Sequence, residues 1–124
     1  MTYNPRTVTE HDRSYAYNVL WAGFPLSLLL LTGLLVPAFE FLAAVAGGFV
    51  SGTFIALVFI GNHDEFVRGQ LAFAANWALS FAGFVLFAQV VPIARDYEPD
   101  AGLVLAIMGT IFHAALAYRR VRDR

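Results

Sequence analysis

The sequence predicts an all-α integral membrane protein, in which residues 14–118 form one membrane domain of four transmembrane helices. The helices make a bundle of two helical hairpins, and both termini are cytoplasmic. Three observations support this prediction. The chain is 59% hydrophobic and only 14% charged, whereas about a quarter of the residues in a soluble domain are charged. Its eight basic and nine acidic residues fall into five short clusters, separated by four uncharged runs of bilayer-crossing length. Finally, nearly all basic residues belong to the two tails and the central cluster.

The chain begins with a polar tail, residues 1–13, which lacks the basic start and short apolar core of a signal peptide. The first span covers residues 15–36, since about 20 apolar residues rising ~1.5 Å each cross a hydrocarbon core of roughly 30 Å. Pro25 lies inside this span and removes one backbone donor, which predicts a kink that a neighbouring helix must cover. Pro37 then ends the helix, and a tight turn follows.

The second span, residues 41–60, carries two sets of small residues spaced four apart, so that each set shares a helix face. The first set is Ala44, Gly48 and Gly52. The second set is Ala43, Gly47 and Ser51. Because helices in lipid are not driven together by the hydrophobic effect, close approach through small residues is a main source of their association. We therefore expect this span to pack tightly, most readily on another span of the chain, with a second copy as the alternative.

The third and fourth spans cover residues 70–91 and 101–118, and an acidic loop joins them. An Arg-rich cytoplasmic tail, residues 119–124, closes the chain. Arg119 and Arg120 begin this tail, and their long side chains are expected to anchor the helix end by reaching the membrane interface.

The distribution of basic residues predicts the orientation. Placing both tails and the segment between the second and third spans on one side gives that side every arginine except Arg95. The positive-inside rule then places these segments in the cytoplasm. The predicted location is therefore the plasma membrane, and the principal predicted partner is the lipid bilayer. No nucleic-acid partner is expected.

The segment between the second and third spans is the only charged interruption in the middle of the chain. Its acidic residues precede a helix, where they complement the positive end of the helix dipole by ~0.3–1 kcal/mol. Its arginine would reach lipid phosphates or pair with the acids, and docking of a soluble partner or of the C-terminal tail is the alternative. The motif residues are Asp64, Glu65, Phe66, Val67, Arg68, Asn76 and Trp77.

The pattern Asp-Glu-Phe-Val-Arg followed by Asn-Trp resembles a segment of small prokaryotic four-span membrane proteins of unknown function, a Tic-twenty-like family distantly similar to a chloroplast import component. Arg13 followed by Ala16 resembles the entry to that family's first helix. Two of the family's histidines fall on Leu20 and Gln70 here, so a role that needs them is not carried over. The resemblance implies a part in protein translocation or membrane-complex assembly, through a membrane-protein partner or a homo-oligomer.

Three polar residues inside the spans are expected at similar depth in the inner leaflet, namely Asn18, Asn76 and His113. Because a polar side chain in the membrane must be satisfied, they are predicted to gather near the bundle axis. The expected direct hydrogen bond joins Asn76 to His113, and membrane precedent gives such a bond roughly 0.6–1.7 kcal/mol.

The residue types argue against catalysis, so we expect no enzyme activity and no cofactor. The chain has no cysteine, and its three histidines lack the local spacing of metal ligands. No carboxylate lies inside a span, which disfavours proton-coupled export. A channel or small-solute transporter remains the main alternative to an assembly role. A metal- or haem-binding membrane protein ranks below both.

Overall fold

A computed structural model of the protein describes residues 10–62, 65–93, 96 and 100–123. This part of the chain is almost wholly helical and contains no strand. Two short 3₁₀ segments belong to the first hairpin. η1 (Pro37–Phe39) lies in its turn, and η2 (Leu57–Asn62) follows directly after its second helix. The α-helices are α1 (Glu10–Leu35), α2 (Glu40–Ala56), α3 (Glu65–Val90) and α4 (Ala101–Arg122).

The four predicted helical segments are confirmed, although α1 and α3 each begin five residues before the predicted span. Backbone hydrogen bonding does not stop where the apolar run begins, so these helices continue into charged sequence. α4 begins where predicted, because the Asp100 carboxylate accepts a hydrogen bond of 2.9 Å from the backbone N–H of Leu103 and caps the helix.

Three helical stretches in the described part of the chain are long and apolar enough to cross a membrane, and α1 contributes a shorter apolar stretch. The long stretches are Pro37–Phe59, Glu65–Val90 and Ala101–Arg122. The shorter one is Leu20–Leu35, which lies within the predicted first span.

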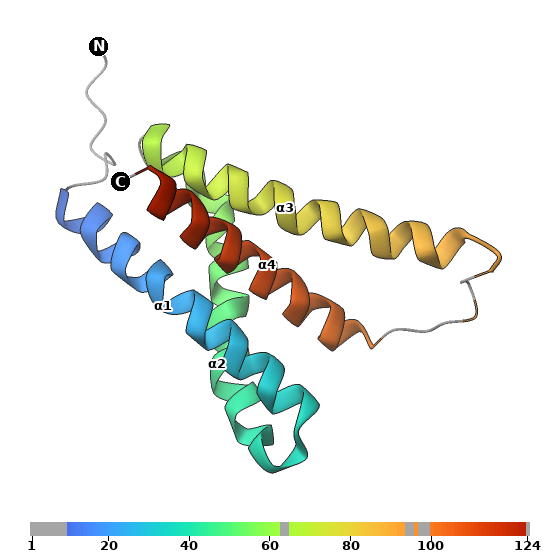
Figure 1. Ribbon diagram of the computed structural model, residues 1–124. Helices are drawn as coiled ribbons and strands as arrows, with labels where there is room; N and C mark the ends of the chain where they lie inside the picture. The colour runs from blue at the N-terminus through green and yellow to red at the C-terminus, as the bar shows by residue number, and fades with distance from the viewer. Residues whose placement is uncertain (1–9, 63–64, 94–95, 97–99, 124) are drawn as a thin grey trace.

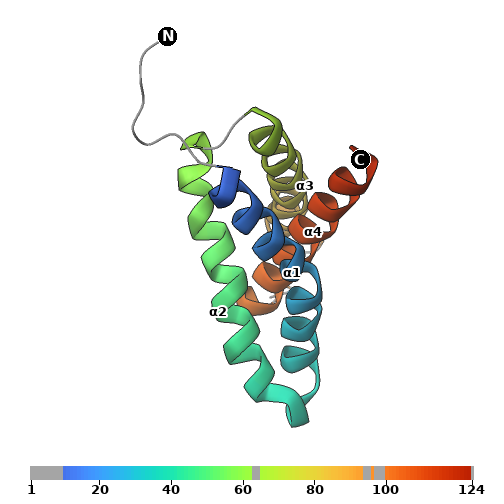
Figure 2. The same cartoon turned by 90° about the vertical axis from the view of Figure 1, so that its left-hand side faces the viewer.

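The helices form two hairpins that meet at one end and diverge toward their turns. α1 packs on α2, α3 packs on α4, and the contact between α1 and α4 joins the two pairs. The η1 turn and the far end of the second hairpin lie well apart (Figures 1 and 2). The two hairpins therefore lie nearest to each other around η2 and the C-terminal part of α4. We call this region the shared end.

Two apolar clusters fill the interior. The first joins α3 to α4 near the shared end and consists of Val67, Leu71, Ala74, Ala78, Phe112 and Leu116. The second joins α1, α2 and α4 and consists of Leu30, Ala46, Val50 and Ala106. Phe54 of α2 packs against both clusters and meets Phe112 edge to face at 5.8 Å.

Small residues allow α1 and α2 to approach closely. A Cβ atom at Gly33 would lie only 2.6 Å from the backbone nitrogen of Ala43, and one at Gly47 would touch Leu30 at 3.4 Å. Ala43 and Gly47, from one of the two small-residue faces predicted for α2, therefore pack inside the chain, whereas Ser51 of the same face is exposed. Consecutive residues of a helix are turned by about 100°, so the neighbouring face points elsewhere.

That neighbouring face, Ala44, Gly48 and Gly52, lies on the outside of α2. All three residues are exposed, and a Cβ atom at Gly48 or Gly52 would meet nothing within 4 Å. The sequence favoured packing of these residues on another span of the chain, but the described helices leave this face open.

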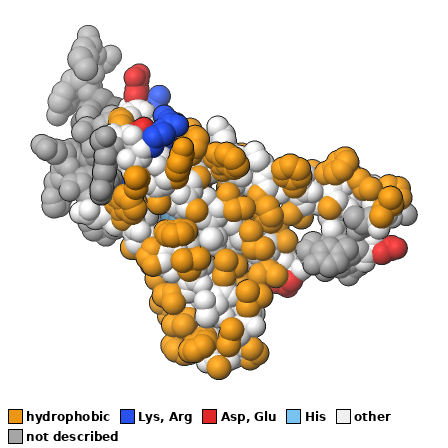
Figure 3. Space-filling model, in the orientation of Figure 1, with side chains coloured by type: hydrophobic (Ala, Val, Ile, Leu, Met, Phe, Trp, Pro, Cys, Tyr) orange, Lys and Arg blue, Asp and Glu red, His pale blue; other side chains and the backbone are white. Residues whose placement is uncertain are grey.

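On the face shown in Figure 3, large apolar side chains cover most of the surface between the ends, basic and acidic side chains gather at the shared end, and acidic side chains lie near the far end of the second hairpin. Val45, Val58 and Phe84 are each more than 70% exposed. A continuous apolar surface of this kind is far larger than the isolated patches of a soluble monomer. It fits the membrane environment that the sequence predicts.

Candidate functional site

The polar side chains buried in the described part of the chain lie mainly toward the shared end. They are Ser27, Thr53, Gln70, His113 and Arg120. Ser27 is satisfied within its own helix by donating a 2.7 Å hydrogen bond to the carbonyl of Phe24. The other residues connect different parts of the fold.

His113 of α4 makes a buried polar contact that links the two hairpins. Its Nε2 atom lies 3.1 Å from the hydroxyl oxygen of Thr53 on α2. That hydroxyl has one proton, which it donates to the carbonyl of Val50 at 2.7 Å. It must therefore accept from His113, which assigns a proton to Nε2. The other ring nitrogen, Nδ1, is buried and has no hydrogen-bond partner among the described residues.

The imidazole ring of His113 lies directly against Gly23 of the first helix. A Cβ atom at Gly23 would overlap the ring, so only glycine fits at this position of α1. Phe112 closes another side of the ring at 5.0 Å between centroids. His113 therefore holds α1, α2 and α4 together where the two hairpins cross.

The predicted inner-leaflet cluster is wrong in its membership. His113 is buried as expected, but Asn18 and Asn76 are exposed, and the predicted hydrogen bond from Asn76 to His113 is replaced by the bond to Thr53. α3 packs through Ala74 and Ala78. Asn76 lies two positions from each of them, which turns it by about 200° to the opposite face of the helix. Thr53, a partner that the sequence pattern did not indicate, is the only threonine of the second span.

The motif residues at the start of α3 are spread over the helix surface. Val67 enters the core, whereas Glu65, Phe66, Arg68 and Trp77 are exposed. Glu65 lies in the first turn of α3, where its charge complements the helix dipole. Asp64 lies outside the described residues. No group of three His, Asp or Glu side chains with the geometry of a metal site occurs in the part of the chain that the structure describes.

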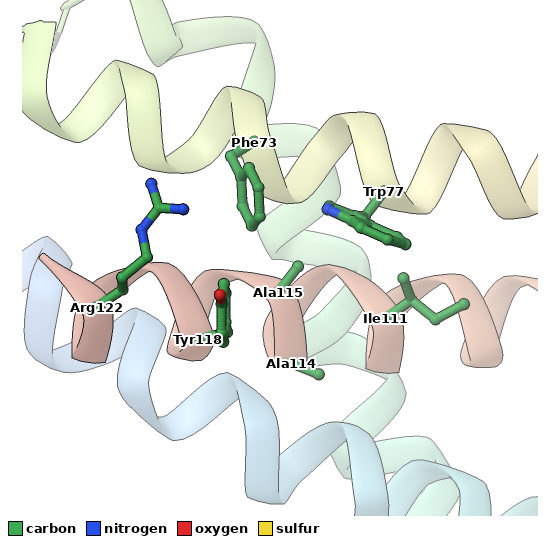
Figure 4. Close-up of a pocket in the computed structure, with 7 residues that line it drawn as sticks. All are labelled: Phe73, Trp77, Ile111, Ala114, Ala115, Tyr118 and Arg122. Carbon is green, nitrogen blue, oxygen red and sulfur yellow. The ribbon is translucent and has the colours of Figure 1, made fainter.

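An open groove of about 600 Å³ runs between α3 and α4 near the shared end (Figure 4). Phe73 of α3 stacks on Tyr118 of α4, with 6.2 Å between ring centroids, and meets Trp77 edge to face at 6.4 Å. The residues that line the groove are Phe73, Trp77, Ile111, Ala114, Ala115, Tyr118 and Arg122.

Two arginine side chains lie near one end of this groove. Arg119 donates a 2.9 Å hydrogen bond to Asp123 and lies 5.2 Å above the Phe73 ring. Arg122 approaches the other carboxylate oxygen of Asp123 at 3.7 Å. The hydrogen bond from Arg119 is the main reason why the pKa of Asp123 falls below its usual value, and Gln70 and Arg122 add to the effect.

The two predicted anchoring arginines have different environments. Arg119 is partly exposed, as an anchor would be, but Arg120 is only 3% exposed and its guanidinium lies 5.7 Å from the centre of the Trp21 ring. Arg120 follows His113 by seven residues, so it shares the buried face of α4. Its predicted role as a snorkelling anchor is therefore wrong, and it contributes to packing between α4 and α1.

Comparison of the chain with protein-family models, with curated proteins and with solved structures gives no match. The family resemblance of residues 64–77 therefore stays a prediction from the motif.

Proposed function

We propose that the protein is a non-enzymatic plasma-membrane protein that assembles through its helices, either with further copies of itself or with a membrane-protein partner. The motif resemblance suggests protein translocation as the setting. The observation that carries the proposal is the outward face of α2, where Ala44, Gly48 and Gly52 are exposed with open space above both glycines.

This face has the composition of a helix-association surface. Small residues allow two backbones to approach closely, and in lipid such close packing replaces the hydrophobic effect as the source of association. Val45 and Ile55 flank the small residues, and both are about 70% exposed. A partner helix lying over Gly48 would therefore also contact these larger side chains.

The assembly proposal predicts that Gly48→Leu disrupts the complex. The added side chain would prevent close approach, and overpacking of this kind costs about 1–3 kcal/mol, which weakens association at least about fivefold. Chemical cross-linking in native membranes and sizing in mild detergent would measure the change. The matched control is Gly83→Leu, since Gly83 is equally open but lies on α3.

A monomer of the unchanged protein that co-purifies with no partner would contradict the assembly proposal. Disruption by Gly83→Leu alone would move the association surface to α3 and contradict the role given to α2.

The proposed orientation places both termini and the start of α3 in the cytoplasm, as the positive-inside rule requires. Because the chain has no cysteine, single cysteines report position cleanly. With an impermeant thiol reagent on intact cells, Asp96→Cys is expected to react, whereas Phe66→Cys reacts only after permeabilisation. Labelling of position 66 in intact cells would contradict this orientation.

The channel alternative receives less support. The buried polar side chains gather toward the shared end, whereas the cluster that joins α1, α2 and α4 toward the first turn is apolar. Polar groups line the selective part of a conduction path, and this apolar cluster offers none. Assembly is therefore the function that we put forward.

A further inference from the structure

We propose that the groove between α3 and α4 binds one phospholipid with an anionic headgroup. The phosphate lies at Arg122, and one acyl chain follows the groove from Tyr118 toward Ile111. This inference concerns a ligand site and is independent of the assembly surface on α2.

The groove has the shape and lining that an acyl chain requires. Its walls are the rings of Phe73, Trp77 and Tyr118, and the small side chains of Ala114 and Ala115 leave the space between them (Figure 4). Apart from the guanidinium at one end, the lining is almost wholly apolar. An alkyl chain buries surface here, whereas a polar solute would lose its hydration without hydrogen-bond partners.

The length of the groove matches one leaflet. Arg122 and Ile111 are eleven residues apart on α4, which corresponds to ~16 Å along the axis at ~1.5 Å per residue. Half of a hydrocarbon core of roughly 30 Å is ~15 Å. A lipid whose headgroup lies at Arg122 would therefore extend its chain along the groove to about the bilayer midplane.

The charge at the headgroup end favours an anion. In the last turn of α4, Arg119 and Arg122 share one carboxylate, that of Asp123. Arg119 holds Asp123 at 2.9 Å, whereas the Arg122 side chain is 51% exposed and 3.7 Å from the same carboxylate. The Arg122 guanidinium is thus the group best placed to donate to phosphate oxygens, which its planar fork fits.

Native mass spectrometry of the protein in mild detergent, titrated with phosphatidylglycerol and phosphatidylcholine of the same chain length, tests the proposal. We expect one phosphatidylglycerol to be retained in preference to phosphatidylcholine. Arg122→Gln should reduce this preference roughly fivefold, the ratio that corresponds to ~1 kcal/mol for a basic residue near an anionic surface. Arg68→Gln is the matched control, because Arg68 is exposed but does not line the groove.

A second pair of variants tests the acyl-chain part of the site. Trp77→Ala should weaken retention of both lipids, since it removes one wall of the groove. Leu79→Ala should have no effect, because Leu79 is similarly exposed but does not line the groove. Trp77 and Leu79 are both more than half exposed, so neither substitution removes core packing.

Equal retention of the two lipids by the unchanged protein would overturn the proposal. So would an equal loss of preference in Arg68→Gln and Arg122→Gln, since it would indicate a diffuse positive surface instead of a site. Gly48→Leu should leave lipid retention unchanged, which separates this test from that of the assembly surface.

Discussion

Gly23→Ala is expected to destabilise the protein strongly. The new Cβ atom would overlap the imidazole ring of His113. The ring cannot retreat easily, because Thr53 holds Nε2 at 3.1 Å and Phe112 packs against another side. Overpacking usually costs about 1–3 kcal/mol, and a displaced ring would also lose a hydrogen bond worth roughly 0.6–1.7 kcal/mol in membrane helices.

Thermal or SDS-induced unfolding of the purified protein in detergent measures this loss. Gly83→Ala is the matched control, because its Cβ atom would meet nothing within 4 Å and Gly83 lies outside the proposed association face. Its effect should stay within about 0.5 kcal/mol. His113→Ala provides the stricter test, because it removes the ring that Gly23→Ala would strike. The cost of Gly23→Ala should then fall in the His113→Ala background, and additive costs would contradict the close contact.

Gly33→Ala is expected to open the first hairpin. Its Cβ atom would lie 2.6 Å from the backbone nitrogen of Ala43 and 2.8 Å from the carbonyl oxygen of Phe39. Backbone atoms cannot rotate away as a side chain can, so α1 and α2 must separate beside their turn. We expect a destabilisation of at least about 3 kcal/mol, the upper end of the usual cost of overpacking.

The same unfolding assay checks this prediction, and the distance between spin labels on the exposed residues Leu35 and Phe41 reports whether the hairpin opens. Gly47→Ala is a control in the same interface, because its Cβ atom would make an ordinary contact of 3.4 Å with Leu30. If Gly33→Ala were no more harmful than Gly47→Ala, the close approach of α1 and α2 would be refuted.

The candidate site was only partly predictable from the sequence. The sequence indicates that His113 is a polar residue that must be buried and satisfied, and equal expected depth in the membrane favoured Asn76 as its partner. Depth follows from position along the chain. The partner depends on which face of each helix is turned inward, and α3 turns Ala74 and Ala78 inward and Asn76 outward.

The two small-residue faces of α2 illustrate the same limit. Their spacing of four was visible in the sequence, and both were suited to close packing. Only the tertiary structure distinguishes them, since Gly47 meets Leu30 of α1 whereas Gly48 meets nothing. Arg120 is a third case, because an arginine just beyond a span is equally suited to anchoring and to burial until the rotation of α4 is known.

The sequence by itself determined that this chain is helical, where each apolar segment lies, and that proline and charged residues separate the segments. These properties are local, since they depend on the length of an apolar run and on the residues that interrupt it. The tertiary structure alone decided the rotation of each helix, the divergence of the two hairpins, and the contact of His113 with Gly23 and Thr53. In a soluble helix the polar face reveals which side points outward. Here nearly every face is apolar, so only packing between distant segments separates the interior from the surface.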